Sequence, residues 1–192
     1  MTEIEKVNQP INLHTISALQ EIKLSDGVKL RPLIQSDDAR ILEVLKADSS
    51  IRDRVSVASR LHTVKDITKE IEQYRKDAGL IRYVLLKESN PIGLVSLWRD
   101  DGLFGEPPHL DDYGFGYFLD PNERGKGLTT RAVQSLMDAV VENLKVNQFV
   151  AFCEDNNKES VSVLLRLGFE PTDTLFPEPD NGWMERKYIK KL

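Results

Sequence analysis

The residues best suited to chemistry in this sequence form a short basic loop with two glycines, Arg124-Gly125-Lys126-Gly127. Glycine has no Cβ, so a backbone with glycines at alternate positions turns tightly and approaches a ligand closely. If a helix begins after Gly127, its free N–H groups and positive dipole end attract anions. Arg124 and Lys126 add charge-assisted hydrogen bonds. The pattern indicates a diphosphate site; the alternative is an ordinary strand-to-helix turn with solvated basic side chains.

Two well-known phosphate-binding loops do not fit this stretch. A P-loop needs Ser or Thr after its Gly-Lys pair, and here a second glycine stands there. A dinucleotide fingerprint counted from Gly125 needs a glycine at Thr130, and one counted from Gly114 needs a glycine at Leu119. The predicted anion site therefore belongs to another class.

The spacing of apolar residues predicts the elements that hold the loop. Residues 113–119 indicate a short aromatic strand, and residues 120–122 a Pro-containing turn. After the loop, apolar residues recur on one face of a long helix: Leu128, Ala132, Leu136, Ala139 and Val140. The loop is thus expected to join the end of a strand to the start of a helix.

The composition of the chain bounds its class. At 192 residues it is long enough for one domain with a buried core, which we expect over residues 21–192 after a partly flexible N-terminal extension, residues 1–20. A hydrophobic fraction of 40% and a charged fraction of 30% are typical of a soluble globular protein. The net charge of −5 argues against nucleic-acid binding by the chain as a whole.

Targeting and metal signals are weak in this sequence. No apolar run approaches the length of a membrane span, and the N-terminus lacks the apolar segment of a signal peptide, so we expect no membrane partner. The single cysteine, Cys153, excludes an intramolecular disulfide, and this fits a reducing cytoplasm. The three histidines are scattered, so we predict no metal site. A monomer and a homodimer are both compatible with the sequence.

The remaining elements follow along the chain. An Asp-Gly pair between two alternating runs predicts a β-hairpin over residues 21–32. A helix is expected to start at residues 35–38, with Ile41, Leu42 and Leu45 facing inward. Thr63 is predicted to cap a helix over residues 64–77, with Asp66 completing a capping box. Residues 48–62 show no clear pattern.

The rest of the chain predicts a mixed sheet. Residues 81–86 and 92–98 indicate an antiparallel pair. Residues 100–112 form a turn-rich acidic loop, either a solvated connector or a lip on the substrate side. The last elements expected are a strand over 148–153, a helix over about 158–167, a Pro-rich bend over 176–179 and a strand over 183–189. The fold class is therefore α+β, with helices on both faces of the sheet.

Three segments together resemble the GNAT superfamily of acyl-CoA-dependent N-acetyltransferases, closest to the branch named for ribosomal-protein N-terminal acetyltransferases. The segment from Gly116 to Pro121 is similar to that branch's strand end, GYWLDP. The segment from Arg124 to Thr129 is similar to the pyrophosphate loop R-x-x-G-x-G/A, although Thr129 replaces the small last residue. The third segment, similar to the one that follows the family's fifth strand, is Cys153-x-x-x-Asn157-x-x-Ser160, then Val163-Leu164-x-Arg166-Leu167-Gly168-Phe169.

The resemblance, which covers about Val28 to the C-terminus, implies a coenzyme site. It implies that the central strand and the 148–153 strand splay apart, so that backbone groups near Phe118 and Leu119 hold the pantetheine arm of acetyl-CoA as an added strand would. An N–H near Leu119 would hold the developing oxyanion. Asn157 would bond the pantetheine amide, or is a turn or cap residue. The loop residues implied to bind coenzyme A are Arg124, Gly125, Lys126, Gly127, Leu128 and Thr129.

The resemblance also implies that the acceptor amine attacks the thioester directly, which makes the amine's proton important. At pH 7 freeing a lysine amine costs about 4.6 kcal/mol, whereas freeing an α-amino group costs about 1.1 kcal/mol. Many relatives place a Glu on the central strand where this chain has Gly114. An enzyme with a poor base still serves α-amines.

Four carboxylates are candidates for the base, and the alternative for each is a plain surface carboxylate, which is what a lone acid on a loop usually is. Glu178 is the leading candidate because the related branch places a catalytic Glu at about this distance beyond its Gly-Phe pair. The other candidates are Asp180, Asp112 and Glu106.

Ser160 and Cys153 complete the catalytic candidates. Ser160 stands where relatives offer a hydroxyl to the departing thiolate; the alternative is that it caps its helix. Cys153 either lines the acceptor channel or is a small buried apolar residue.

The predicted function is acetyl-CoA-dependent N-acetylation of a primary amine, with a protein N-terminus as the leading acceptor. One alternative is a small-molecule acceptor such as an amino acid, polyamine or antibiotic, for which the acidic residues Glu106, Asp111 and Asp112 would suit a cation. Another is a module that binds acyl-CoA without catalysis, which only the glycine at position 114 supports.

Overall fold

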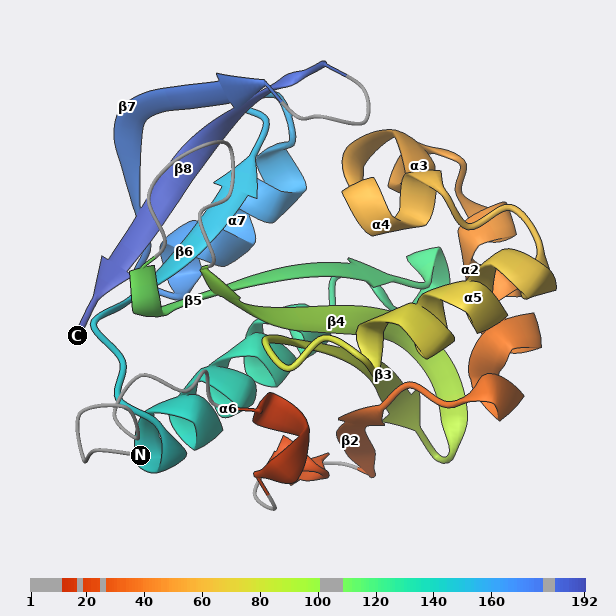
Figure 1. Cartoon of the computed structure of the whole chain (residues 1–192). Helices are drawn as coiled ribbons and strands as arrows, with labels where there is room; N and C mark the ends of the chain where they lie inside the picture. The colour runs from red at the N-terminus through yellow and green to blue at the C-terminus, as the bar shows by residue number, and fades with distance from the viewer. Residues whose placement is uncertain (1–11, 17–18, 25–26, 101–108, 178–181) are drawn as a thin grey trace.

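One sheet runs through the whole molecule (Figure 1). The computed structural model describes residues 12–16, 19–24, 27–100, 109–177 and 182–192. Eight strands follow one another in the order β1-β2-β3-β4-β5-β6-β8-β7. They are β1 (Ile22–Lys23), β2 (Val28–Pro32), β3 (Leu80–Lys87), β4 (Asn90–Asp100), β5 (His109–Leu119), β6 (Gln148–Cys153), β7 (Glu170–Pro177) and β8 (Met184–Lys191). All neighbours are antiparallel except β5 and β6, which are parallel, so the sheet is mixed, as expected from the sequence.

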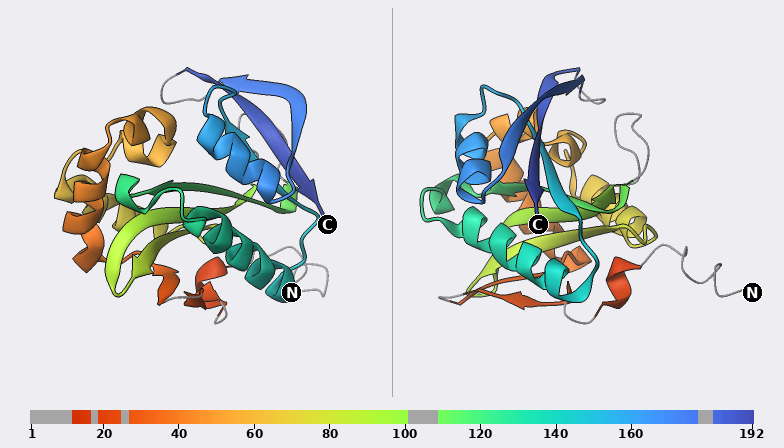
Figure 2. Two further views of the ribbon diagram at one scale, coloured as in Figure 1. Left: turned by 180° about the vertical axis from the view of Figure 1, so that it is seen from behind. Right: turned by 90° about the vertical axis from the view of Figure 1, so that its left-hand side faces the viewer.

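Helices cover both faces of the sheet, as the sequence predicts (Figures 1 and 2). The α-helices are α2 (Asp38–Ala47), α3 (Ser50–Arg54), α4 (Ser56–Ser59), α5 (Val64–Tyr74), α6 (Leu128–Asn143) and α7 (Lys158–Arg166). Among the described residues, 3₁₀ turns at Leu13–Thr15, Gln35–Asp37 and Pro121–Glu123 accompany them. One apolar core joins α6 and α7 to the sheet, and a second core, which contains Val84 and Phe118, joins α2 to α5 to the opposite face.

The predicted helices form where their apolar spacing indicates. In α6 the residues Leu128, Ala132, Leu136 and Val140 are at most 4% exposed, and Ala139 packs against the same core. In α5 the Thr63 side chain accepts from Asp66 N and Asp66 accepts in return, which is the predicted capping box. The helix ends at Tyr74, three residues before the predicted end. Ile41, Leu42 and Leu45 of α2 are buried as expected.

Three stretches differ from the sequence prediction. β5 begins at His109, so residues 109–112 belong to the central strand and not to the loop; the two consecutive aspartates, Asp111 and Asp112, are not typical of a strand and concealed this. Residues 50–59 form the short helices α3 and α4, where the sequence shows no clear pattern. β7 is not predicted, because a mostly exposed edge strand with prolines near both ends lacks the apolar alternation of a half-buried strand.

The described part of the N-terminal region packs on the domain. Leu13 and Leu19 are fully buried in the core that α6 covers. Tyr83 of β3 donates from its hydroxyl to Leu19 O at 3.0 Å. In the part of the chain that the structure describes, no helix has the length and apolar character that crossing a membrane requires.

Candidate active site

The site begins where two strands of the sheet part. β5 and β6 pair over three residue pairs and lose contact after Gly114 and Val150, whereas β5 continues to Leu119 and β6 to Cys153. The predicted splay is therefore present. It leaves one side of β5 without a neighbouring strand, so its backbone groups there are open to an extended ligand.

The register shows which backbone groups face this opening. Asp120 N donates to Ile92 O at 2.7 Å, and β4 and β5 then pair without interruption from Gly93–Leu119 to Trp98–Gly114. Hydrogen-bonded and non-hydrogen-bonded pairs alternate in an antiparallel ladder, so the N–H and C=O of Leu119 and Tyr117 point away from β4, toward the opening. The same alternation directs the groups of Phe118 toward β4. Of the two residues expected to hold the arm through their backbone, Leu119 thus faces the opening, whereas Phe118 does not.

A cavity of about 1070 Å³ occupies the opening. It is lined from the splayed strands, from the loop before α6, from α7, and from α3 and α4 on the opposite face of the sheet. Almost all of the site residues predicted from the sequence line it: Phe118, Leu119, Arg124, Gly125, Gly127, Leu128, Thr129, Cys153, Asn157 and Ser160.

The glycine loop has the backbone that its sequence suggests. Gly125 and Gly127 have φ of 75° and 69°, a left-handed conformation that L side chains rarely adopt. A Cβ built on either glycine meets nothing within 4 Å, so the backbone and not crowding requires glycine there. Gly127 is the N-cap of α6 and has no side chain to occupy its first N–H groups, which leaves them available to an anion.

The two basic residues of the loop point in different directions. Arg124 Nη1 contacts Asp48 Oδ2 at 2.7 Å, and its Nη2 donates to Leu119 O at 3.3 Å, at the wall of the cavity. Lys126 does not line the cavity: its Nζ donates to Asn122 O at 2.8 Å and to Glu123 Oε2 at 2.9 Å. Hydrogen bonds from Lys126 and Lys87 lower the pKa of Glu123.

A pair of hydroxyls lies where α7 meets β5. Tyr117 Oη and Ser160 Oγ are 2.9 Å apart. Burial raises the pKa of Tyr117, so the phenol stays protonated at neutral pH. The capping role that was the alternative for Ser160 belongs to Asn157, whose Oδ1 accepts from Ser160 N at 3.3 Å. The sequence reading did not single out Tyr117, although it stands in the Gly-Tyr pair of the strand motif.

Cys153 lies beside this pair and is poorly suited to be a nucleophile. It is 3% exposed, and its Sγ donates to Glu154 O at 3.4 Å. Burial raises the pKa of the thiol to about 11, while the hydrogen bond with Ser160 acts in the opposite direction. A thiol that is protonated at neutral pH is a weak nucleophile.

The candidate bases lie in different places. Glu178, Asp180 and Glu106 are outside the described residues. Asp112 is 3% exposed and accepts from Gln148 Nε2 at 2.6 Å, and it does not line the cavity. Glu185 of β8 does line the cavity, and its charge is one of the factors that raise the pKa of Cys153.

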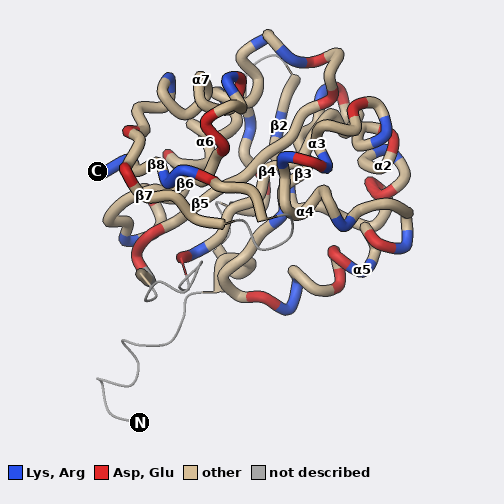
Figure 3. The backbone as a smooth tube through the Cα atoms, turned by 90° about the horizontal axis from the view of Figure 1, so that it is seen from above, with Lys and Arg blue, Asp and Glu red and all other residues tan. Residues whose placement is uncertain are grey.

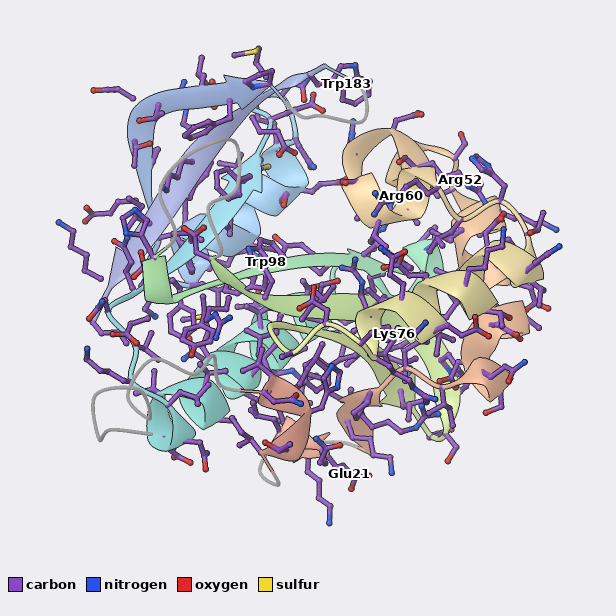
Figure 4. The ribbon with its side chains drawn as sticks, viewed as in Figure 1. Glu21, Arg52, Arg60, Lys76, Trp98 and Trp183 are labelled. Atoms are coloured by element: carbon purple, nitrogen blue, oxygen red, sulfur yellow. The ribbon has the colours of Figure 1, made fainter. Side chains whose placement is uncertain are left out.

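The packing of Trp98 explains why position 114 is a glycine. A Cβ at Gly114 would lie 2.4 Å from the Cε2 and Nε1 atoms of the Trp98 indole, which packs against the strand there. No carboxylate fits at this position while Trp98 keeps its place. In Figure 4 Trp98 lies beside the sheet and Arg60 at α4, and both side chains line the cavity.

The comparisons with known proteins agree with this geometry. The family model "Acetyltransferase (GNAT) domain" matches residues 28–170. The chain belongs to the GNAT acetyltransferase family. It is an enzyme of the acyltransferase class that uses acetyl-CoA as co-substrate, and the glycine loop and the open strand edge fit the diphosphate and the pantetheine arm of that molecule.

Named relatives of this acetyltransferase differ in what they acetylate. This chain is 23% identical over 172 residues to the ribosomal-protein-serine acetyltransferase of Escherichia coli K12, and the match covers 88% of this chain and 84% of the relative. It is 24% identical over 152 residues to the spermidine N(1)-acetyltransferase of the same strain, covering 79% and 77%. The solved structure of RimL, a ribosomal alpha-N-protein acetyltransferase in complex with coenzyme A, shares the fold with a TM-score of 0.75 and 15% identity, covering 90% and 98%.

Proposed function

We propose that this acetyltransferase transfers the acetyl group of acetyl-CoA to the α-amino group of a protein or peptide. The observation that carries the proposal is the packing of Trp98 on Gly114, which closes the strand position where many relatives hold a glutamate. Without that base, an α-amine is the better acceptor, because releasing its proton at pH 7 costs about 3.5 kcal/mol less than releasing that of a lysine side chain. The similarity to a ribosomal-protein-serine acetyltransferase supports the same class.

The proposed roles follow from the cavity. The first turn of α6 and the loop from Arg124 to Gly127 hold the diphosphate, and the backbone of Tyr117 and Leu119 holds the pantetheine arm. The Leu119 N–H faces the opening and stabilises the oxyanion that forms as the amine attacks the thioester carbon. The amine nitrogen bonds to that carbon and loses a proton to solvent, and the carbon–sulfur bond breaks. Ser160 with Tyr117 delivers a proton to the departing thiolate and takes one back from solvent.

The test is acetylation of a peptide series with one free amine in each member. One peptide has a free N-terminus and no lysine, and a second has a blocked N-terminus and one lysine; spermidine represents the small-molecule alternative. Thiol release gives kcat/KM, and mass spectrometry locates the acetyl group. We expect turnover on the free N-terminus. Turnover confined to the lysine peptide or to spermidine would reject the proposal, and coenzyme A binding without turnover of any amine would favour a binding module.

A further inference from the structure

The cavity passes from one face of the sheet to the other. Tyr117 contacts Ser160 of α7, on the face that α6 and α7 cover, whereas Phe118 packs with α2 to α5 on the opposite face. Arg82 pairs in register with Ser96, and Ser96 with Gly116, so these residues share the face of Phe118. The coenzyme loop and the helices α3 and α4 both line the cavity, and the wall beneath α3 and α4, its second end, is where the acceptor would lie.

Arginines gather at this second end. Arg54 of α3, Arg60 at the C-cap of α4 and Arg82 of β3 all line the cavity. The whole cavity wall carries six arginines and one lysine against four carboxylates, although the chain has a net charge of −5. Figure 3 shows Lys and Arg positions at α3 and beside α4. The lining side chains taken alone thus carry a net positive charge, while Arg82 and Arg124 pair with Glu70 and Asp48, which do not line the cavity.

Arg82 is fixed in place. Its Nε and Nη2 donate to Glu70 Oε1 at 2.9 and 2.7 Å, and its Nη1 donates to Ser96 Oγ at 2.7 Å. Burial lowers the pKa of Arg82, Glu70 and Asp77 oppose this, and the positive charge of Arg60 lowers the pKa further. Arg60 and Arg82 both line the cavity, and an anion bound by both guanidinium groups would reduce the repulsion between them.

Arg54 and Trp98 line the same wall. Arg54 is exposed and forms no side-chain hydrogen bond or ion pair with the described residues. The indole Nε1 of Trp98 is buried against Gly114 and has no acceptor among them, which costs free energy. A polycation such as spermidine satisfies none of these groups.

We infer that the acceptor carries an anionic group close to its reactive amine, and that Arg54 and Arg60 bind it, with Arg82 behind them. This inference rests on the proposed function and narrows it: the preferred acceptor is a peptide whose first residues after the free N-terminus are acidic. A guanidinium binds a carboxylate through paired, charge-assisted hydrogen bonds, which a neutral side chain does not replace.

The experiment compares peptides that differ only in charge. Each begins with a free serine, followed by aspartate and glutamate, by their isosteres asparagine and glutamine, or by two lysines; spermidine and O-phosphoserine are assayed beside them. We expect the acidic peptide to exceed its isostere about tenfold in kcat/KM, as a charged hydrogen bond implies, and the lysine peptide to be slower still. Arg54→Gln and Arg60→Gln should each reduce that preference, and the double variant should abolish it.

Control variants distinguish an anion site for the acceptor from a loss of folding or of coenzyme binding. Arg75→Gln removes an exposed arginine that does not line the cavity, and should keep the full preference. Melting temperatures show whether each variant is folded. Equal rates on the acidic peptide and its isostere would overturn the inference while leaving N-terminal acetylation intact. A raised KM for acetyl-CoA in Arg54→Gln or Arg60→Gln, equal for all acceptors, would overturn it too, since the arginines would then serve the coenzyme.

The remaining arms identify the source of the charge. If O-phosphoserine is turned over faster than every peptide, the anionic acceptor stands but the peptide is rejected, and with it the proposed function. Spermidine as the best acceptor would reject both. Absence of turnover on every amine would reject the proposed function and the inference together.

Discussion

Removing the hydroxyl of Tyr117 tests the proton delivery most sharply. At pH 7 a thiolate whose conjugate thiol has a pKa near 8.5 gains about 2 kcal/mol on protonation, which limits the benefit of a proton donor to about 30-fold in rate. Because Tyr117 Oη and Ser160 Oγ lie 2.9 Å apart, the proposed mechanism treats them as one donor. We expect Tyr117→Phe and Ser160→Ala to lower kcat by up to about 30-fold each, and the double variant to be no slower than either.

The pH dependence distinguishes this role from a structural one. Burial keeps the pKa of Tyr117 above its ordinary value, so the donor remains protonated through the neutral range. As the pH rises, the thiolate needs the proton less, so the deficit of Tyr117→Phe should shrink to about 3-fold at pH 8 and vanish above about pH 8.5. Stopped-flow thiol release at saturating substrates measures kcat at each pH.

A matched control lies on the same strand. Tyr113 is 1% exposed and does not line the cavity, so Tyr113→Phe should leave the rate within about twofold of the wild type, because its hydroxyl has no role in transfer. A constant deficit of Tyr117→Phe from pH 7 to 9, or a double variant whose losses multiply, would refute the proposed proton delivery.

Three further outcomes follow from the geometry. Gly127→Ala should cost about 1–2 kcal/mol of backbone strain at a φ of 69° and raise the KM for acetyl-CoA, as thermal unfolding and kinetics will show. Gly114→Glu should destabilise by about 1–3 kcal/mol in urea unfolding, because its Cβ would meet Trp98 at 2.4 Å; a stable, faster enzyme would contradict this. Cys153, whose pKa burial raises to about 11, should resist a thiol reagent at pH 8 in the native protein and react after unfolding; rapid native labelling would contradict its burial.

The coenzyme half of the site could be predicted from the sequence because its determinants are local. Gly125 and Gly127 indicate a left-handed backbone within four residues, and the helix after them follows from apolar spacing. The splay of the strands was predicted from the family resemblance, since no local sequence pattern indicates where the pairing of two strands ends. The direction of the Lys126 side chain could not be predicted in this way, because it turns to Glu123 and not to the cavity.

The acceptor half depends on residues far apart in the chain. Tyr117 and Ser160 are separated by 43 positions, and Arg82 meets Ser96 only through the β3–β4 register. Arg54 and Arg60 belong to a segment in which the helices are only five and four residues long. The apolar residues of such short helices show no helical period, so α3 and α4 could not be predicted.

Two of the acidic residues predicted as a possible lip on the substrate side form contacts away from the cavity. Asp111 contacts Lys145 at 2.6 Å, and Asp112 accepts from Gln148. Neither lines the cavity, whereas arginines from three separate elements do. The charge at the acceptor end thus arises from tertiary packing, and no single stretch of the sequence indicates its sign.

Arg124 connects the two halves. The sequence suggests a phosphate ligand, and the structure gives the same guanidinium two other partners, Asp48 after α2 and the Leu119 carbonyl at the end of β5. Hydrogen bonding to Ser50 and to Arg124 lowers the pKa of Asp48, so the carboxylate stays ionised at neutral pH and the pair persists. A guanidinium has five donors, so two contacts leave others for a phosphate oxygen. Asp48 lies just before α3, the helix that carries Arg54, so the residue that would hold the coenzyme also fixes the wall against which the acceptor would bind.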